Sequence, residues 1–118
     1  MNDLLSWLLV GHMAGDYLFQ TRWMAERKAT SMSALTAHSA VYACAVWLAS
    51  LPALPWKGLS PFCVLLVFAS HAVIDRPGLV RWWRRYVTKS EKEWLGIMTD
   101  QALHVVFLAL ACLLERQI

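Results

Sequence analysis

The sequence predicts an all-α polytopic membrane protein, a four-transmembrane-helix up-and-down bundle that forms a single domain over residues 1–118. Three observations lead there: the composition, the spacing of apolar segments and the distribution of basic residues. Of the 118 residues, 58% are hydrophobic and 16% are charged, against about 45–50% and about 25% in soluble domains. A soluble domain this small has too little interior to hide so many apolar side chains. The excess is therefore expected to face lipid, and three widely spaced cysteines do not fit a secreted disulfide scaffold.

Each of the four expected helices corresponds to one apolar segment, and the segments cover residues 4–20, 34–51, 61–75 and 95–114. Crossing a bilayer takes about 20 residues, so the first and third segments are expected to need a thinned bilayer or polar flanks at the interface. Backbone groups in lipid must be satisfied within the segment, which predicts helices. Pro52 and Pro55 are expected to close the second helix, Pro61 to open the third, and Pro77-Gly78 to end it.

Basic residues predict the orientation in the membrane. Nine of the eleven Lys and Arg residues lie in the loops between the first and second and between the third and fourth apolar segments. Because cytoplasmic loops carry this excess, we expect a multi-pass protein of the bacterial cytoplasmic (inner) membrane with both termini outside. The first twenty residues lack a basic start and have an interrupted apolar stretch, so we expect no cleavable signal peptide.

Residues 79–87 carry Arg81, Arg84 and Arg85 among aromatic side chains. This pattern predicts a short interfacial helix, between the third and fourth membrane helices, that contacts anionic lipid headgroups. Membrane lipids are thus the expected partners and nucleic acid is not. A protein partner or a homo-oligomer is left open.

Ionisable residues inside the apolar segments are the most informative feature. Each segment holds one of the four histidines, and three of these have an aspartate four residues away: His12 with Asp16, His71 with Asp75, and His104 with Asp100. A spacing of four places both side chains on one face of a helix. At 1.5 Å per residue, these pairs and His38 occupy one layer, on the order of 10 Å thick, in the cytoplasmic half.

Such a layer needs compensation, because each carboxylate at the centre of a spanning helix costs about 2.5–3.5 kcal/mol on insertion scales. Imidazole and carboxylate groups suit divalent transition metals, and seven suffice for two ions with one bridging carboxylate. Zinc is the first expectation, and manganese or iron also fits. Gly11 and Gly15 form a small face that lets a neighbouring helix approach closely. The candidate metal ligands are His12, Asp16, His38, His71, Asp75, Asp100 and His104.

Two other interpretations of the polar layer stay open. One is a His–Asp network that only fixes the register of the helices. The other is a haem held by two of the histidines, which would leave the aspartates unexplained.

Three classes of function compete. The first is a metal-dependent hydrolase acting on a lipid or lipid-linked substrate at the cytoplasmic leaflet, with Asp16 or Asp100 as the proton acceptor. The second is a proton or ion pathway, although the outer halves of the apolar segments are almost wholly apolar. The third is a non-catalytic interaction protein. Four further residues are expected near the site. The two glutamines are expected to contact the metal ligands or the substrate, and the two arginines to attract an anionic headgroup: Gln20, Gln101, Arg76 and Arg81.

The polar motifs resemble those of the DUF3307 family of small bacterial and phage membrane proteins of unknown function. The resemblance rests on Gly-His-Met-Ala-Gly-Asp-Tyr-Leu-Phe-Gln at 11–20, on His38, on His-Ala-Val-Ile-Asp at 71–75 and on Asp-Gln-Ala-Leu-His at 100–104. It covers nearly the whole chain and implies the same grouping of polar residues, without supplying a reaction. The polar pattern is also similar to that of membrane-bound metal-dependent hydrolases, which place His and Asp on apolar helices. This second resemblance implies metal-dependent hydrolysis.

Overall fold

A computed structural model describes residues 3–118 of the chain. The first two residues of the segment that is expected to escape signal-peptide cleavage lie outside the described range. The chain is all-α, with 79% of it helical and no strand between residues 3 and 118. In chain order the helical elements are α1 (Leu4–Met13), η1 (Ala14–Leu18, a π-helical turn), α2 (Arg22–Arg27), α3 (Met32–Ser50), α4 (Pro61–Asp75), α5 (Pro77–Trp83), η2 (Arg84–Thr88, again π-helical) and α6 (Glu93–Gln117).

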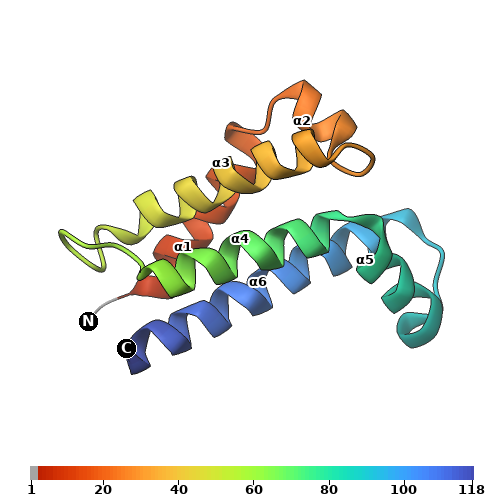
Figure 1. Cartoon of the computed structure of the whole chain (residues 1–118). Helices are drawn as coiled ribbons and strands as arrows, with labels where there is room; N and C mark the ends of the chain where they lie inside the picture. The colour runs from red at the N-terminus through yellow and green to blue at the C-terminus, as the bar shows by residue number, and fades with distance from the viewer. Residues whose placement is uncertain (1–2) are drawn as a thin grey trace.

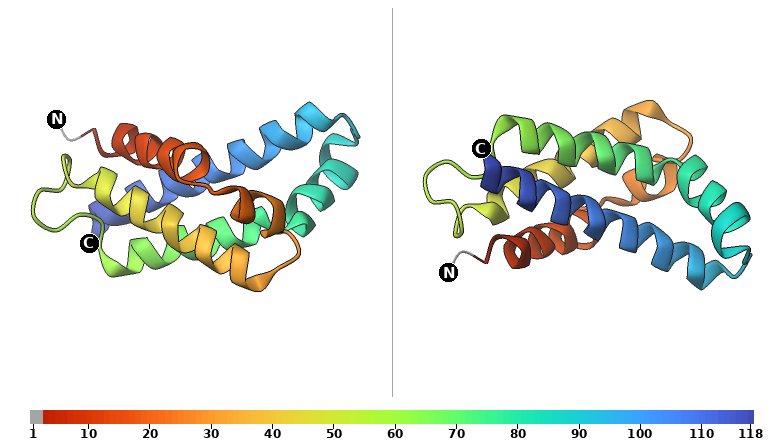
Figure 2. Two further views of the ribbon diagram at one scale, coloured as in Figure 1. Left: turned by 90° about the horizontal axis from the view of Figure 1, so that it is seen from above. Right: turned by 90° about the horizontal axis from the view of Figure 1, so that it is seen from below.

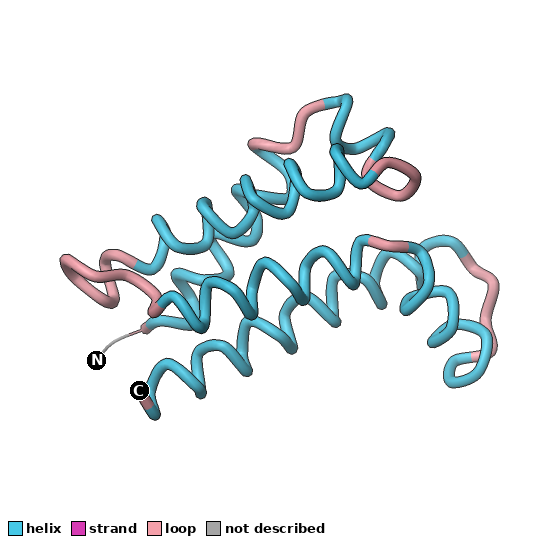
Figure 3. The backbone as a smooth tube through the Cα atoms, viewed as in Figure 1, coloured by secondary structure: helices cyan, strands magenta, loops and turns pink. Residues whose placement is uncertain are grey.

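The long helices run alternately up and down (Figure 1). Helix α1 packs on α3, α3 on α4, and α4 on α6, while α6 also contacts α1. The C-terminus, the start of α1 and the loop between α3 and α4 lie together at one end of the molecule, and the connections on either side of α2 and η2 lie at the other (Figures 1 and 2). The loops are thereby collected at two opposite ends, as the tube drawing shows (Figure 3).

Helix length and apolar composition identify two or three candidate membrane spans, not clearly the expected four. Helices α3 and α6 qualify alone, and their lengths of about 28 and 37 Å compare with a hydrocarbon core of about 30 Å. Helix α4 qualifies only together with residues 77–88, which continue it after a bend of 67°. Residues 4–18 reach about 22 Å, so the first helix is too short to qualify.

The outer surface of the helices suits lipid. Large apolar side chains on three different helices, among them Val10, Leu65 and Val106, are more than half exposed. Membrane association therefore agrees with both the helix lengths and the exposed apolar surface.

Local sequence signals explain where the helices begin and end. The hydroxyls of Thr21, Ser31 and Ser60 accept hydrogen bonds from backbone N–H groups at the starts of α2, α3 and α4. Pro61 is the first residue of α4, as expected. Arg76 is extended, with φ −74° and ψ 142°, so α4 ends before Pro77 as expected, and a new helix starts there at a different angle.

Two differences from the sequence-based expectations involve the first loop. The first helical segment ends at Leu18 rather than at residue 20, because Phe19 leaves the helical conformation (φ −112°, ψ 8°). The Gln20 side-chain amide instead donates a hydrogen bond to the Asp16 carbonyl oxygen. Helix α2 was not expected, because six residues are too few for a periodic apolar pattern.

The interior divides into an apolar half and a polar half. An apolar core is built around Leu8, Val46, Val67 and Leu108. These residues precede the polar residues on α1 and α4 and follow them on α3 and α6, so the core lies toward the end that holds the termini. The sequence predicts close approach of a neighbouring helix at Gly11, and the structure shows that this helix is α3, because a Cβ at Gly11 would lie only 2.7 Å from Val46 Cα. This crossing brings the polar residues of α1 and η1 against α3.

Candidate metal centre

The structure brings the seven predicted polar residues into one buried layer. The four histidines come from α1, α3, α4 and α6, and the aspartates from η1, the last position of α4, and α6. Asp100 is the most accessible, with 31% of its side chain exposed. The other six residues are all buried: His12, Asp16, His38, His71, Asp75 and His104.

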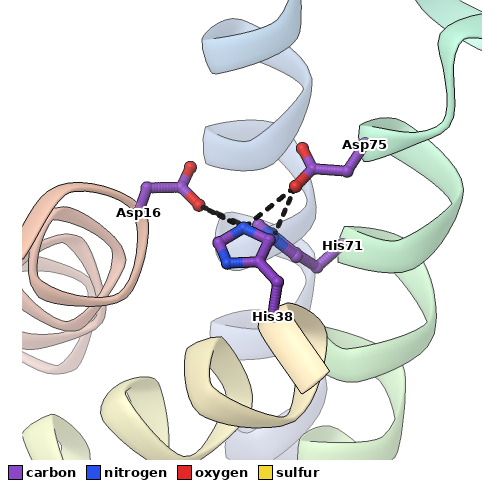
Figure 4. Close-up of side chains that lie close together, drawn as sticks. All are labelled: Asp16, His38, His71 and Asp75. Atoms are coloured by element: carbon purple, nitrogen blue, oxygen red, sulfur yellow. Dashed lines mark ion pairs between the residues drawn. The ribbon is translucent and has the colours of Figure 1, made fainter. Parts of the chain in front are cut away.

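Four of these residues form a central cluster, Asp16, His38, His71 and Asp75 (Figure 4). Asp75 Oδ2 lies 3.0 Å from the Nε2 atoms of both His38 and His71. Asp16 Oδ1 lies 3.3 Å from His38 Nε2 and 3.5 Å from His71 Nε2. Three separate elements, η1, α3 and α4, therefore direct two nitrogen and two oxygen atoms at a common point.

The spacing of the central cluster matches a metal site. Tetrahedral ligands at about 2.0–2.2 Å from an ion lie about 3.3–3.6 Å from one another, close to the 3.0–3.5 Å found between these nitrogen and oxygen atoms. None of the four atoms, Asp16 Oδ1, His38 Nε2, His71 Nε2 and Asp75 Oδ2, has a partner in hydrogen-bond geometry, and the one lysine ammonium paired with them, that of Lys28, reaches only Asp75 Oδ2 among residues 3–118. Because buried polar atoms rarely stay unpaired, these buried groups can hold a metal ion.

A second group of possible ligands, Asp75, Asp100 and His104, adjoins the central cluster. His104 Nδ1 lies 2.8 Å from the Asp100 carbonyl oxygen, which only accepts hydrogen bonds, so the proton of a neutral ring belongs on Nδ1. The other nitrogen, Nε2, is then an acceptor facing Asp75 Oδ1 at 3.6 Å. Two acceptors facing each other are stabilised either by a metal ion between them or by a second proton on the His104 ring, and Asp75 is the carboxylate common to both groups.

His12 lies beside these two groups and belongs to neither. Its Nδ1 is 2.9 Å from the hydroxyl of Tyr42, and its Nε2 is 2.8 Å from Oε1 of Gln101. The nearest carboxylate oxygen, on Asp16, is 3.7 Å away. Both ring nitrogens therefore have protein partners, which favours a positioning role over the predicted role as a metal ligand.

Two residues of the site were missed by sequence reasoning. Lys28 Nζ lies 3.0 Å from Asp75 Oδ2, and its side chain is 23% exposed. In the sequence, Lys28 was interpreted only as one of the basic loop residues that predict the orientation in the membrane. The Tyr42 ring stacks on His71 with centroids 3.7 Å apart, and its position four residues after His38 is a signal that could have identified it.

The four residues expected to contact the metal ligands or the substrate lie in different places. Gln101 contacts His12, and Gln20 folds onto the backbone of Asp16. Arg76 and Arg81 line two different pockets, and no His or Asp of the polar layer lines either one.

The arrangement is compact and closed. His71 packs against His38 and His104 with ring centroids 4.7 and 4.6 Å apart. Rings in direct contact leave no room for a porphyrin between them, which argues against the haem alternative.

The fold and the site together define an all-α, membrane-associated protein with a buried His/Asp cluster. Residues 4–117 match the family described as "Protein of unknown function (DUF3307)", and the chain belongs to this family. Comparison with curated proteins and with solved structures gave no match.

Proposed function

We propose that this chain is an intramembrane metal-binding protein whose central cluster holds a divalent ion. The observation that carries the proposal is the convergence of four buried donor atoms, from Asp16, His38, His71 and Asp75, that do not hydrogen-bond to one another. Mixed imidazole and carboxylate ligands make zinc the first choice, with manganese or iron as alternatives.

The proposed setting is the bacterial inner membrane, with the long helices forming a four-span bundle and both termini outside. The nine basic residues of the two loops support this side assignment. The start of α1 and the C-terminus lie at the same end of the molecule, together with the α3–α4 loop (Figures 1 and 2). This placement supports an even number of crossings. The α1–η1 segment and helix α4 are both short for a membrane span, so the bilayer would thin around them.

Calorimetric titration of Zn²⁺ into chelator-treated protein in mild detergent tests metal binding. We expect saturable binding by the wild type and its loss in Asp75→Asn, because this carboxylate touches both groups. Ser39→Ala is the matched control, since Ser39 follows His38 directly on α3, is buried and has no partner for its hydroxyl. No saturable binding by the wild type, or equal binding by Asp75→Asn, would favour a network that only fixes helix register.

Hydrolysis of a lipid or lipid-linked substrate, at a phosphate or ester, is the reaction we propose for this site. The favouring observation is that the two oxygens of Asp75 face different groups, an arrangement suited to two neighbouring ions acting on one substrate. Bound zinc would supply a water nucleophile at neutral pH. The chain would supply the proton acceptor, and Asp100 suits that role because solvent reaches it and only one of its two carboxylate oxygens is needed as a metal ligand.

Substrate access is the requirement that bears most on this reaction. The central cluster is buried, and Lys28 lies at its edge, where it also lines a small pocket with Arg76. Displacement of Lys28 from Asp75 would open the cluster on the side of the basic loops. An anionic substrate at the cytoplasmic leaflet could attract both of these cationic side chains.

Incubation of zinc-loaded protein with total bacterial lipid extract, followed by mass spectrometry, tests hydrolysis. We expect one lipid species to decrease and its hydrolysis product to accumulate with the wild type but not with His71→Ala. A product that forms equally with His71→Ala, or no change in any species, would contradict catalysis and favour a structural or interaction role for the metal.

A proton or ion pathway is the weaker alternative. The apolar core around Leu8, Val46 and Leu108 occupies the other half of the interior. A pathway would need polar groups to continue through that half.

A further inference from the structure

A second candidate binding site lies away from the His/Asp layer, where α5 and η2 turn back toward α6. A pocket of about 800 Å³ opens there. The segment that lines this pocket, from α5 through η2 to the following turn, lies at the end of the molecule opposite the termini (Figures 1 and 2). We refer to this pocket as the basic pocket, and its lining residues are Arg81, Arg84, Arg85, Lys89, Ser90 and Glu91.

Positive charge dominates the basic pocket. Four of its lining side chains are cationic and one is acidic. None of these four cations forms an ion pair within residues 3–118, although Arg22 and Lys28 elsewhere in the chain do. Cations gathered around one concavity repel each other unless an anion enters it, so the pocket is complementary to a ligand of charge −1 to −2.

Packing holds one wall of the basic pocket in place. Arg84 Nη2 donates a hydrogen bond to the Lys92 carbonyl oxygen, 3.0 Å away, while its Nε is buried without a partner. A Cβ at Gly96 would lie 2.8 Å from Arg84 Nη1, so this guanidinium packs directly against the backbone of α6. Lys89 closes the turn in the left-handed region at φ 52°. Arg84, which is fixed in this way, loses less conformational freedom on binding a ligand than the exposed Arg81, Arg85 and Lys89.

The surroundings of the basic pocket suit the membrane interface. Trp82 and Tyr86, on the same segment, are both more than half exposed. Such amphipathic rings gather at the level of lipid headgroups. The 67° bend after α4 directs this segment away from the axis of the helix that precedes it.

We propose that the basic pocket binds the phosphate of one anionic phospholipid headgroup. This goes beyond general attraction of a basic surface to acidic lipids, because a pocket predicts retention of a defined number of lipids. It is independent of the metal site, with which it shares no lining residue. Basic pockets on the cytoplasmic side of membrane proteins bind phosphate headgroups in this way.

Native mass spectrometry of the detergent-purified full chain tests the proposal. Phosphatidic acid, phosphatidylglycerol and phosphatidylcholine are added separately, and bound lipids per chain are counted. The test variant is Arg81→Gln/Arg85→Gln. The matched control, Arg22→Gln/Arg27→Gln, removes the same charge from helix α2, outside the pocket.

We expect one retained anionic lipid per wild-type chain and none of the zwitterionic lipid. The test variant should lose about 30-fold in affinity, since each basic residue near an acidic surface contributes about fivefold, whereas the control should lose less than threefold. Equal losses in both variants would overturn the proposal in favour of general surface attraction. Retention of phosphatidylcholine at the same level would also overturn it.

Inorganic phosphate separates a lipid from a free anion as the ligand. We expect millimolar phosphate to leave the bound lipid in place, because the acyl chains add hydrophobic affinity. Displacement of the lipid at equimolar phosphate would show that the pocket is selective for a free anion and would contradict the lipid assignment. Circular dichroism spectra that match the wild type confirm that each variant is folded.

Discussion

At the scale of single residues, Asp75 Oδ2 is the atom on which most of the site depends. Three nitrogen atoms, from Lys28, His38 and His71, each lie 3.0 Å from it. A divalent ion and the Lys28 ammonium would therefore compete for the same oxygen. Lys28 is the residue whose removal separates a metal site from a purely ionic network.

Lys28→Met is expected to raise Zn²⁺ affinity at least tenfold, because it removes a positive charge a few ångströms from the ion. Titration calorimetry measures the change, with Arg27→Gln as the control for loss of a neighbouring charge. In a network without metal, Lys28 instead neutralises Asp75, and its removal leaves a buried carboxylate unpaired. Unchanged or weaker zinc binding accompanied by lower thermal stability would support that network.

The two histidines His12 and His71 should behave differently. His71→Asn removes a proposed ligand and should change the visible absorption bands of the Co²⁺-loaded protein, whereas His12→Asn should leave them in place. The physical reason is that Tyr42 and Gln101 already occupy both ring nitrogens of His12. Altered bands in His12→Asn together with unaltered bands in His71→Asn would mean that His12 is a metal ligand and His71 is not.

At the scale of helices, close packing of α1 on α3 positions Asp16. Gly11→Ala should destabilise the protein by about 1–3 kcal/mol, because the new methyl would meet the backbone at Val46, 2.7 Å away, and cannot move aside. Thermal unfolding in detergent measures the loss. Gly78→Ala is the matched control, since a Cβ there meets nothing within 4 Å. Equal melting temperatures for the two variants would mean that α1 does not need this close contact.

The sequence predicts a helix well where its apolar segment is long or where capping and proline residues mark its ends. Residues 61–75 coincide with α4 because Ser60-Pro61 caps its start and Pro77 prevents its continuation. Helix α2 and the π-helical turn around Asp16 were not foreseen. A six-residue helix has no measurable period, and a π turn depends on tertiary packing rather than on a local motif.

The candidate site could be located from sequence, but its ligand assignments could not. A spacing of four residues places Asp75 beside His71 on one helical face, and the structure brings them together. The same rule cannot show that His12 turns toward Tyr42 and Gln101, because both partners come from other helices. The contact between Lys28 and Asp75 could not be predicted either, since it depends on how the loop after α2 folds.

At the scale of the whole molecule, the prediction to be tested is the side of the membrane. In a background with the three cysteines replaced by alanine, Thr30→Cys and Thr88→Cys should be protected from an impermeant thiol reagent in intact cells. Lys57→Cys, in the opposite loop, should be labelled. The reason is the excess of basic residues in the two loops that carry positions 30 and 88. Labelling at 30 and 88 with protection at 57 would reverse the orientation.

The polar layer concentrates the chemistry in one half of the molecule and leaves the other half apolar. Six buried ionisable residues there need a compensating cation or a complete set of hydrogen bonds. Lys28 forms an ion pair with Asp75, but the nitrogen and oxygen atoms of the central cluster make no hydrogen bonds to one another, which favours a further cation. Metal binding is therefore the claim on which the proposed chemistry of this layer depends.

Elemental analysis of the mildly purified protein, combined with its melting temperature with and without chelator, tests that claim most directly. We expect one or two divalent ions per chain, zinc foremost, and a melting temperature that falls when the chelator removes them, since an ion bound only to the folded state stabilises it. A protein without stoichiometric metal, whose melting temperature does not change with chelator, would contradict the metal centre.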